Sequence, residues 1–236
     1  MELIGHRGGA GIGPENTVVA IETSIRSEAD GVEVDVRLTA DRALVLMHDP
    51  DVSRTTNGSG RVDALTLAEL RALDAGDGAR VPTLEEALEV VPADRLIVVE
   101  LKGHPWESGY DPGEPAARAV AALLAPGGAR RVVVSSFNPV ALQVVRSSAP
   151  AVRTAVLTTA AFDLASNLAG AIDGGHDECH VPAQILEEAF VREAHAAGKG
   201  VVAWTVNDPH RLVTFAGWGV DGVITDDPGA GREALR

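Results

Sequence analysis

Several kinds of residue are scarce in this 236-residue sequence, and each scarcity excludes a class of protein. Cys179 is the single cysteine, so an internal disulfide framework is excluded. No apolar run approaches the ~20 residues of a membrane-spanning helix, so we expect a soluble protein with no membrane span. The first apolar run follows the acidic Glu2 and stops at His6, which does not fit a signal peptide, so we expect a cytoplasmic protein.

Basic residues are also scarce. Lys and Arg number 20 against 34 Asp and Glu, which gives a net charge of -14. Such a charge repels polyanions, and the sequence has no basic stripe, so we expect no binding to nucleic acid or to an anionic membrane. A small anionic substrate would need local cations or a metal ion to overcome this charge.

Short runs rich in Val, Leu and Ile alternate with longer segments of helical period along the sequence. This alternation is typical of repeated βα units around a parallel sheet. There are nine strand candidates, one more than a closed barrel of eight needs, and they favour a (β/α)8 TIM barrel over an open doubly wound sheet. The candidates span residues 3–6, 31–36, 43–48, 96–100, 132–135, 154–157, 178–181, 200–205 and 222–225.

Helical segments and one long insertion lie between these strands. The segment 49–95 is too long for a simple loop. It contains Thr66-x-x-Glu69 and Thr83-x-x-Glu86, two capping-box patterns that each open an apolar helical stretch. We predict one TIM-barrel domain over 1–236, with a small helical insertion at 49–95 after the second barrel strand. The other expected helices span 17–27, 115–124, 139–149, 161–172, 185–197 and 209–218, with a short helix after Gly231.

Acidic side chains share one face on two of the predicted strands. In GVEVDV, Glu33 and Asp35 lie two residues apart, so both point to the face opposite the valines. In LIVVELK, the same phase places Glu100 and Lys102 together at the carboxyl end of the strand. The carboxyl ends of all barrel strands meet at one mouth, where active sites lie. These residues therefore predict a site at the mouth.

Carboxylates held together in a buried barrel repel one another unless a proton or a cation lies between them. Three carboxylates suit Mg²⁺ or Ca²⁺ better than Zn²⁺, whose sites favour Cys and His. His6 and His48 each end a predicted strand at the same mouth. Because an oxygen-rich metal site does not need them as ligands, they are available for acid–base catalysis. Taken singly, each of these residues fits a solvated strand end or a salt bridge, but their shared position favours a site.

The remaining histidines are expected elsewhere. His104, His176, His195 and His210 fall in predicted loops or helices, where we expect surface positions. His180 ends the strand candidate 178–181 and could contact a substrate at the mouth.

A series of motifs runs through the chain: HRG followed by PENT, VEVDVRLT, LVLMHDP, RTTNGSG, VPTLEEAL, VVELK, SSFNP, WTVND and GVDGVITDDP. In order and spacing these nine motifs resemble the glycerophosphodiester phosphodiesterase family, from His6 to Pro228. The resemblance implies a TIM barrel with a small insertion after the second strand. It also implies metal-dependent hydrolysis of glycerophosphodiesters to glycerol 3-phosphate and an alcohol.

The resemblance implies which residues carry the chemistry. Glu33, Asp35 and Glu100 would hold one divalent metal ion, Mg²⁺ or Ca²⁺. His6 and His48 would be the acid and base, and the sequence does not say which is which. The implied nucleophile is the glycerol 2-hydroxyl, which would form a transient cyclic phosphate before water attacks.

Other matching residues would bind the substrate or support the site. By the same resemblance, Arg7 would bind a phosphate oxygen and Lys102 would add charge stabilisation. Trp204 would line the glycerol side. Glu15 and Asn16 of PENT would support the site or the metal shell.

Two short stretches depart from the family pattern, and both lie away from the chemistry. The family usually reads GAD where this chain has Glu28-Ala29-Asp30, and DG where it has Asp41-Arg42. Arg42 lacks the freedom of glycine at positive φ, so an altered turn is expected there. Gly8 and Gly9, by contrast, are expected to bring the backbone close to the substrate.

Two alternative functions stay open. The same site could cleave a lysophospholipid or another phosphodiester, although the segment 49–95 has no aromatic residue to form the apolar rim that a lipid needs. A catalytically silent barrel that binds a phosphorylated ligand is less favoured, because the metal set and both histidines are present. The sequence sets neither the alcohol nor the oligomeric state.

Overall fold

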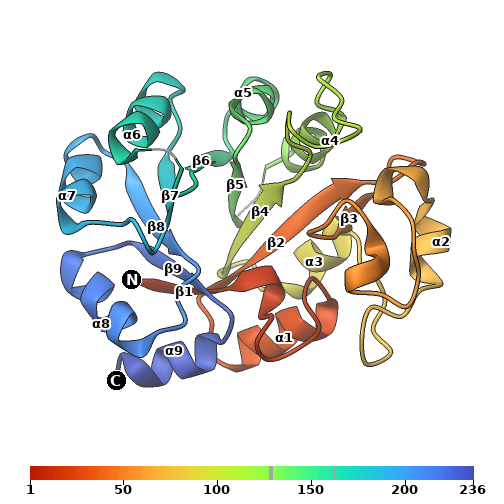
Figure 1. The fold of residues 1–236 in the computed structure, drawn as a ribbon, viewed down its shortest axis with the longest axis horizontal. Helices are drawn as coiled ribbons and strands as arrows, with labels where there is room; N and C mark the ends of the chain where they lie inside the picture. The colour runs from red at the N-terminus through yellow and green to blue at the C-terminus, as the bar shows by residue number, and fades with distance from the viewer. Residues whose placement is uncertain (128–129, 162) are drawn as a thin grey trace.

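The computed structural model describes residues 1–127, 130–161 and 163–236, and its centre is a closed parallel barrel. β1 pairs with both β2 and β9, which closes the ring of eight strands. Figure 1 shows the helices on the outside of this ring. The predicted (β/α)8 fold is confirmed. The barrel strands are β1 (Glu2–Gly5), β2 (Gly31–Leu38), β4 (Leu96–Leu101), β5 (Arg131–Ser136), β6 (Arg153–Leu157), β7 (Glu178–Pro182), β8 (Gly200–Trp204) and β9 (Gly222–Thr225).

The ninth strand candidate lies outside the barrel. β3 (Leu44–Leu46) pairs antiparallel with the end of β2. It leads the chain back over the carboxyl end of β2, where the N–H of Met47 donates to the carbonyl of Asp35 at 2.9 Å. His48 therefore reaches the level of Asp35 from a returning strand, and the expectation that a parallel barrel strand delivers it is wrong.

The helices between the barrel strands fall close to the expected ranges. α6 begins at Leu164 and not at 161, because Asp163 caps it by accepting from the N–H of Ser166; residue 162 of the expected helix lies outside the described residues. The last helix begins ahead of Gly231, because Asp227 caps it. The helices are α1 (Val18–Arg26), α4 (Pro115–Leu124), α5 (Pro139–Ser148), α6 (Leu164–Asp173), α7 (Glu188–Ala196), α8 (Pro209–Trp218) and α9 (Pro228–Ala234).

The segment 49–95 contains short helices with a core of their own. Both capping boxes form, at the starts of α2 (Leu67–Arg71) and α3 (Leu84–Val90), and two 3-10 turns precede them, η2 (Val52–Arg54) and η3 (Val62–Ala64). Figure 1 shows α2 outside the ring of strands. The division into a 1–236 domain with a 49–95 insertion stays a prediction. The segment forms one buried apolar cluster with two residues that precede it, Val45 and Met47, whereas Leu84, Ala87 and Val91 pack into the main core. The segment's own members of the cluster are Val52, Val62, Leu70, Ala75 and Val81.

Successive side chains of each barrel strand point alternately into the barrel and outward to the helices, which divides the core into an inner and an outer layer. On β2 the valines pack outward against the helices, so the acids of the same strand point into the barrel. On β7 the inward residues are Glu178 and His180. His180 is fully buried and its Nε2 lies 2.8 Å from Glu178 Oε2, which is also paired with Arg153. His180 therefore serves an internal ion-pair network, and the suggested contact with a substrate has no support here.

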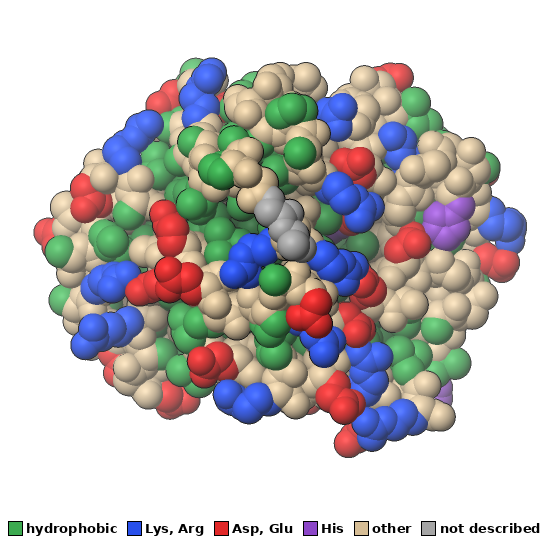
Figure 2. Space-filling model, turned by 180° about the vertical axis from the view of Figure 1, so that it is seen from behind, with side chains coloured by type: hydrophobic (Ala, Val, Ile, Leu, Met, Phe, Trp, Pro, Cys, Tyr) green, Lys and Arg blue, Asp and Glu red, His purple; other side chains and the backbone are tan. Residues whose placement is uncertain are grey.

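Two of the histidines expected at the surface are buried. His104 and His176 are 6% and 2% exposed, whereas His210 is exposed. His176 lies before β7 and packs inward, with Nδ1 2.9 Å from the hydroxyl of Thr154. On the face shown in Figure 2, acidic, basic and apolar side chains are interspersed. Within the described ranges no helix is both long enough and apolar enough to cross a membrane.

Both departures from the family pattern stand where glycine would be favoured. Glu28 and Arg42 have φ values of 61° and 71°, in the left-handed region. The turn at Arg42 is closed by its N–H, which donates to the carbonyl of Thr39 at 3.0 Å. The chain therefore accepts about 1–2 kcal/mol of backbone strain at each position and keeps a left-handed turn at Arg42.

Candidate active site

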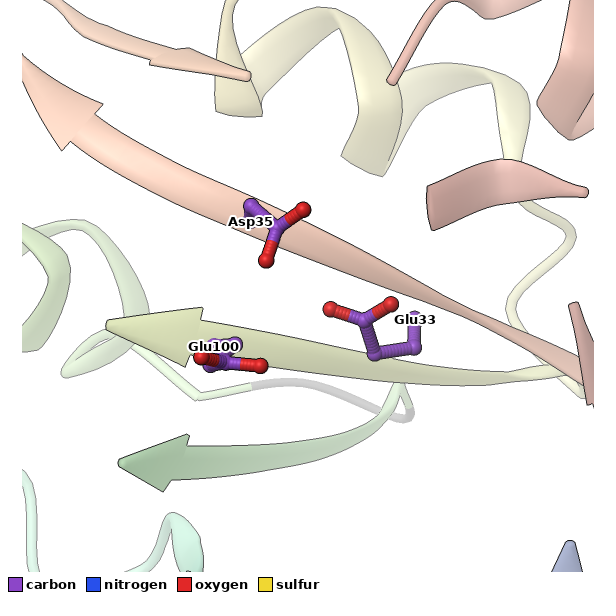
Figure 3. Close-up of side chains that lie close together, drawn as sticks. All are labelled: Glu33, Asp35 and Glu100. Atoms are coloured by element: carbon purple, nitrogen blue, oxygen red, sulfur yellow. The ribbon is translucent and has the colours of Figure 1, made fainter. Parts of the chain in front are cut away.

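Three carboxylates converge at the mouth of the barrel (Figure 3). Glu33 and Asp35 come from β2 and Glu100 from β4, and the register places Asp35 opposite Glu100. One oxygen of each carboxylate lies within 4.8 Å of the others. Glu33 and Asp35 are almost fully buried, at 2% and 1% exposed. The two-residue period of the strands thus brings these three side chains together.

Polar neighbours hold the cluster in place. Asn16 Nδ2 donates to Asp35 Oδ2 at 2.7 Å, and the backbone N–H of Arg7 donates to Glu33 Oε2 at 2.8 Å. Lys102 Nζ lies 2.9 Å from Asp35 Oδ1. Glu33 Oε1 is buried and has no hydrogen-bond partner among the described residues. One ligand-type oxygen of the cluster is therefore left without a protein donor.

The three acids differ in their affinity for a proton. Burial raises the pKa of Glu33 well above its ordinary value, and the charges of Asp35 and Glu100 raise it further. Burial also raises the pKa of Asp35, but the Lys102 ammonium and other cations lower it by more, to well below its ordinary value. Lys102 contacts Glu100 as well, yet burial keeps the pKa of Glu100 raised. Burial and the neighbouring charges therefore disfavour the ionised form of Glu33, and a bound cation would favour it.

This donor set fits a hard divalent cation. The three carboxylates offer only oxygen, the ligand type that Mg²⁺ and Ca²⁺ prefer. An unpaired buried acceptor such as Glu33 Oε1 costs about 1–3 kcal/mol, and a bound cation would remove that cost. Such an ion would also replace the proton that burial and like charge place on Glu33.

His6 lies in the short 3-10 turn η1 (His6–Gly8), directly after β1. Its Nδ1 is 2.6 Å from Asp226 Oδ1, and the other oxygen of Asp226 accepts from Asn207 Nδ2 at 2.5 Å. The hydrogen bond with His6 holds the pKa of Asp226 below its ordinary value. An ionised carboxylate can only accept, so Nδ1 carries the proton. This orientation leaves Nε2 as the atom that can exchange a proton with a substrate.

His48 is held in the same way. Its Nδ1 is 2.6 Å from Asp49 Oδ1, and Arg54 Nε donates to Asp49 Oδ2 at 2.5 Å. Burial raises the pKa of Asp49, but hydrogen bonds from Arg54 and His48 lower it by more, to about 2. The terminal nitrogens of Arg54 donate to both oxygens of Glu15, at 2.9 and 2.7 Å. Arg54 therefore links the carboxylate that orients His48 to Glu15.

Arg7 joins this network at Glu15. Arg7 Nη1 donates to Glu15 Oε1 at 3.0 Å, and its Nε lies 3.6 Å from Asp35 Oδ2. That Nε is buried and makes no hydrogen bond within the part of the chain that the structure describes. Burial raises the pKa of Glu15, but hydrogen bonds and charge from Arg54 and Arg7 lower it by more. Arg7 is thus held beside the acidic cluster by an ionised Glu15.

The glycines after Arg7 pack against α1. Gly8 and Gly9 have φ values of 78° and 115°, and a Cβ on Gly9 would lie 2.2 Å from the hydroxyl of Ser24. A Cβ on Gly8 would lie 3.0 Å from Ile21. The close approach to α1 excludes side chains at both glycines, and the expected approach of this backbone to the substrate stays a prediction.

Trp204 ends β8 at the mouth, where its ring packs edge-on against Phe137 with the centroids 5.7 Å apart. Its Nε1 is buried and lacks a hydrogen-bond partner among the described residues. Seven buried side-chain nitrogens or oxygens in that part of the chain have no partner, and four belong to Arg7, Glu33, His104 and Trp204. Unpaired polar atoms therefore concentrate around the mouth, where a polar ligand could satisfy them.

The sequence analysis missed the residues that orient the histidines. Asp226 follows β9 directly, so the same rule that selected the ends of other barrel strands could have found it. Asp49 is next to His48 in the sequence, and Arg54 lies in the RTTNGSG motif. Asn207 lies in the WTVND motif, but only the fold shows that it binds Asp226.

Known proteins match this chain over nearly its whole length. The sequence model of the glycerophosphoryl diester phosphodiesterase family matches residues 6–230. YhdW of Bacillus subtilis is 36% identical over 237 residues, which cover 97% of this chain and 95% of that protein. The glycerophosphodiester phosphodiesterase of Caldanaerobacter subterraneus is 33% identical over 242 residues, which cover 96% and 94%. The structure of an Oleispira antarctica phosphodiesterase in complex with the product sn-glycerol-3-phosphate has a TM-score of 0.90 at 28% identity, and covers 100% of this chain and 96% of that one.

Proposed function

This chain belongs to the glycerophosphoryl diester phosphodiesterase family and is an enzyme of that class, and we propose that it uses a divalent metal ion to hydrolyse glycerophosphodiesters to sn-glycerol 3-phosphate and an alcohol. The Caldanaerobacter relative is named for this activity, and the Oleispira structure contains this product. The observation that carries the proposal is the meeting of three carboxylates and two carboxylate-held histidines at one barrel mouth.

The first requirement of the reaction is to neutralise the nonbridging phosphate oxygens. Arg7 is the cation best suited to this, because its buried Nε has no partner among the described residues and lies beside the acidic cluster. Lys102 adds positive charge from the far side of Asp35 and Glu100. Glu33, Asp35 and Glu100 would hold a divalent ion, which would supply Lewis-acid polarisation of the phosphate.

The second requirement is the movement of two protons. One histidine removes the proton of the glycerol 2-hydroxyl as that oxygen bonds to phosphorus. The bond from phosphorus to the other alcohol breaks, and the second histidine gives its proton to the departing oxygen. Water then opens the cyclic phosphate with the two roles reversed, which yields glycerol 3-phosphate and restores both histidines.

Asp226 and Asp49 orient the two rings for this exchange. Each binds the Nδ1 of its histidine at 2.6 Å, so each ring presents Nε2 to the substrate. The two histidines have separate carboxylates, so one can hold a proton while the other lacks it.

The test is an assay of glycerol 3-phosphate release from purified protein, with and without exhaustive chelation. We expect chelation to abolish turnover and added Mg²⁺ or Ca²⁺ to restore it. Glu33→Gln should need far more metal, whereas Glu85→Gln, an exposed change of the same kind on α3, should behave as the parent. Full activity after chelation would refute the metal requirement, and no turnover of any glycerophosphodiester would refute the function.

A further inference from the structure

Four ring side chains form a continuous row at the mouth, which we call the aromatic row: Trp204, Phe137, His104 and Trp106. The ring of Phe137 packs edge-on against Trp204 at 5.7 Å and against His104 at 5.5 Å, and His104 stacks on Trp106 at 4.6 Å with an interplanar angle of 19°. The chain has only three tryptophans, one tyrosine and four phenylalanines, and three of these side chains lie in the row. Such a concentration at the mouth is more than packing of the barrel requires.

One end of the row forms the wall of an open cleft of about 220 Å³ beside His48, which we call the headgroup cleft. Trp204 is not part of this cleft, and neither is His6. The lining residues are Arg37, His48, Lys102, His104, Trp106, Glu107, Phe137 and Thr159. The cleft therefore lies on the side of His48, while Trp204 occupies the other end of the row.

We propose that the headgroup cleft binds the leaving alcohol of the substrate, and that it selects an alkylammonium headgroup through the indole of Trp106. This inference rests on the proposed function. A phosphodiester has two alcohols, and with its glycerol toward Trp204 the second alcohol lies in the cleft. Its oxygen then departs beside His48.

The size and lining of the cleft favour a small headgroup over an acyl chain. Most of the lining side chains are polar, and about 220 Å³ accommodates a choline-sized group but not a long hydrocarbon chain. Both cations in the lining are already paired: Arg37 with Glu107, at 2.9 and 3.1 Å, and Lys102 with the acidic cluster. An anionic headgroup would therefore meet no uncommitted cation among the described lining residues.

Trp106 provides a surface for a cation. Its side chain is 68% exposed although one face of the indole is stacked on His104. Burial lowers the pKa of His104 to about 4, so this ring is neutral and does not repel a cation. An ammonium over a tryptophan face gains about 0.5–2 kcal/mol. The indole carries this preference alone, because the carboxylate of Glu107 in the same cleft is already paired with Arg37.

Arg37 joins this wall to the catalytic side of the mouth. Its Nε donates to the carbonyl of His48 at 2.9 Å, while its terminal nitrogens bind Glu107. The loop that carries His104 and Trp106 is thus tied to the backbone of His48. A headgroup held by Trp106 is positioned relative to the histidine beside which its oxygen leaves.

The test compares two substrates of the same shape that differ in charge: glycerophosphocholine and its carbon isostere, the 3,3-dimethylbutyl ester of glycerol 3-phosphate. We expect the parent to prefer choline by about 2- to 30-fold in kcat/KM, the range that a cation–aromatic contact supplies. Trp106→Ala should abolish this preference and Trp106→Phe should retain part of it. Tyr110→Phe, in the same loop but outside the cleft, should leave the preference unchanged.

Each outcome has a distinct meaning. If the parent hydrolysed neither of these esters nor any other glycerophosphodiester, the proposed function itself would be refuted. Turnover of other glycerophosphodiesters but of neither ester would overturn only the headgroup assignment. If Trp106→Ala lost kcat/KM equally on both esters, or lost none on either, the headgroup assignment would be overturned while the proposed function stands. Selective loss of lysophosphatidylcholine cleavage in mixed micelles, with glycerophosphocholine unaffected, would show that the cleft binds an acyl chain. Trp106 is mostly exposed, and an unchanged Tm would confirm that the variant folds.

Discussion

Replacing either His6 or His48 with alanine should remove one proton transfer and leave the metal set intact. The residues that could hold the ion are the three carboxylates Glu33, Asp35 and Glu100, and neither histidine is among them. The side chains of His6 and His48 are 22% and 34% exposed, so their removal opens no large buried cavity. The structure therefore separates the loss of catalysis from the loss of metal or of the fold.

The expected loss in kcat is on the order of 10²-fold to 10⁴-fold for each variant, the scale of general acid–base catalysis. This corresponds to about 2.7–5.4 kcal/mol of transition-state stabilisation. We expect the full effect and not a fraction of it, because each ring is already oriented by a carboxylate 2.6 Å from Nδ1. Metal affinity, measured by calorimetry, should stay within about threefold of the parent, since all three carboxylates remain.

The assay that separates the two roles compares a natural diester with a p-nitrophenyl diester of glycerol 3-phosphate. p-Nitrophenolate is a good leaving group and needs little protonation, so the variant that lacks the acid should recover most of its activity on this substrate. If the alcohol departs from the headgroup cleft, that variant is His48→Ala. His6→Ala should stay impaired on both substrates.

Two results would refute this reasoning. Loss of bound metal in both variants would make the histidines ligands, and near-parental turnover of the natural diester would make them bystanders. If only His6→Ala recovered its kcat on the p-nitrophenyl ester, His6 would be the acid and His48 the base. The leaving alcohol would then lie on the side of Trp204.

Three further predictions concern the surrounding charges. Glu33→Gln should weaken Mg²⁺ binding at least about tenfold in calorimetry. The unfolding free energy without metal should stay equal or rise, because burial and like charge penalise the ionised form of Glu33. A variant that bound Mg²⁺ as tightly as the parent would contradict this. Arg54→Gln should lower kcat about 10- to 100-fold, since Asp49 loses the donor that orients it, whereas Arg71→Gln, which removes an ion pair with no contact to the histidines, should not. For Glu178, burial raises the pKa, but the hydrogen bond with buried His180 and the charges of the partly exposed Arg153 and Arg131 lower it by more. Its charge therefore stabilises the fold above about pH 4.5, and that stabilisation is lost as pH falls through the lowered pKa. Glu178→Gln should therefore lower the unfolding free energy at pH 7 by about 1.5–3 kcal/mol and flatten its decline in acid, and equal slopes for parent and variant in denaturant titrations would disprove this.

Local periodicity was enough to predict the acidic cluster. Glu33 and Asp35 had to share a face because a strand repeats every two residues, and parallel neighbours put Glu100 at the same height. The barrel itself followed from the alternation of strands and helices. These features depend on neighbours in the sequence or on the rule that parallel strands end together, so no long-range information was needed.

The partners of the histidines needed the three-dimensional fold. His6 and Asp226 are 220 residues apart and meet only because β1 pairs with β9 to close the barrel. His48 was assigned to the mouth for the wrong reason, since an antiparallel hairpin returns it there. His104 was expected at the surface because it lies in a polar loop, and contacts with Trp106 and Phe137 bury it. Loop conformations of this kind are decided by tertiary contacts that sequence patterns do not report.

The balance of charge at the mouth is the physical argument for the proposed divalent ion. Arg7, Arg54 and Lys102 are all engaged by carboxylates, and the whole chain carries a net charge of -14. A phosphodiester anion that approaches such a mouth meets repulsion, which these committed cations only partly offset. Two positive charges at the acidic cluster, together with Lys102, would balance its three carboxylates and remove much of that repulsion where the phosphate must lie. Protonation of Glu33, which burial and like charge favour, and binding of a metal ion would relieve the same repulsion, and for this reason glutamine at that position should weaken metal binding without weakening the fold.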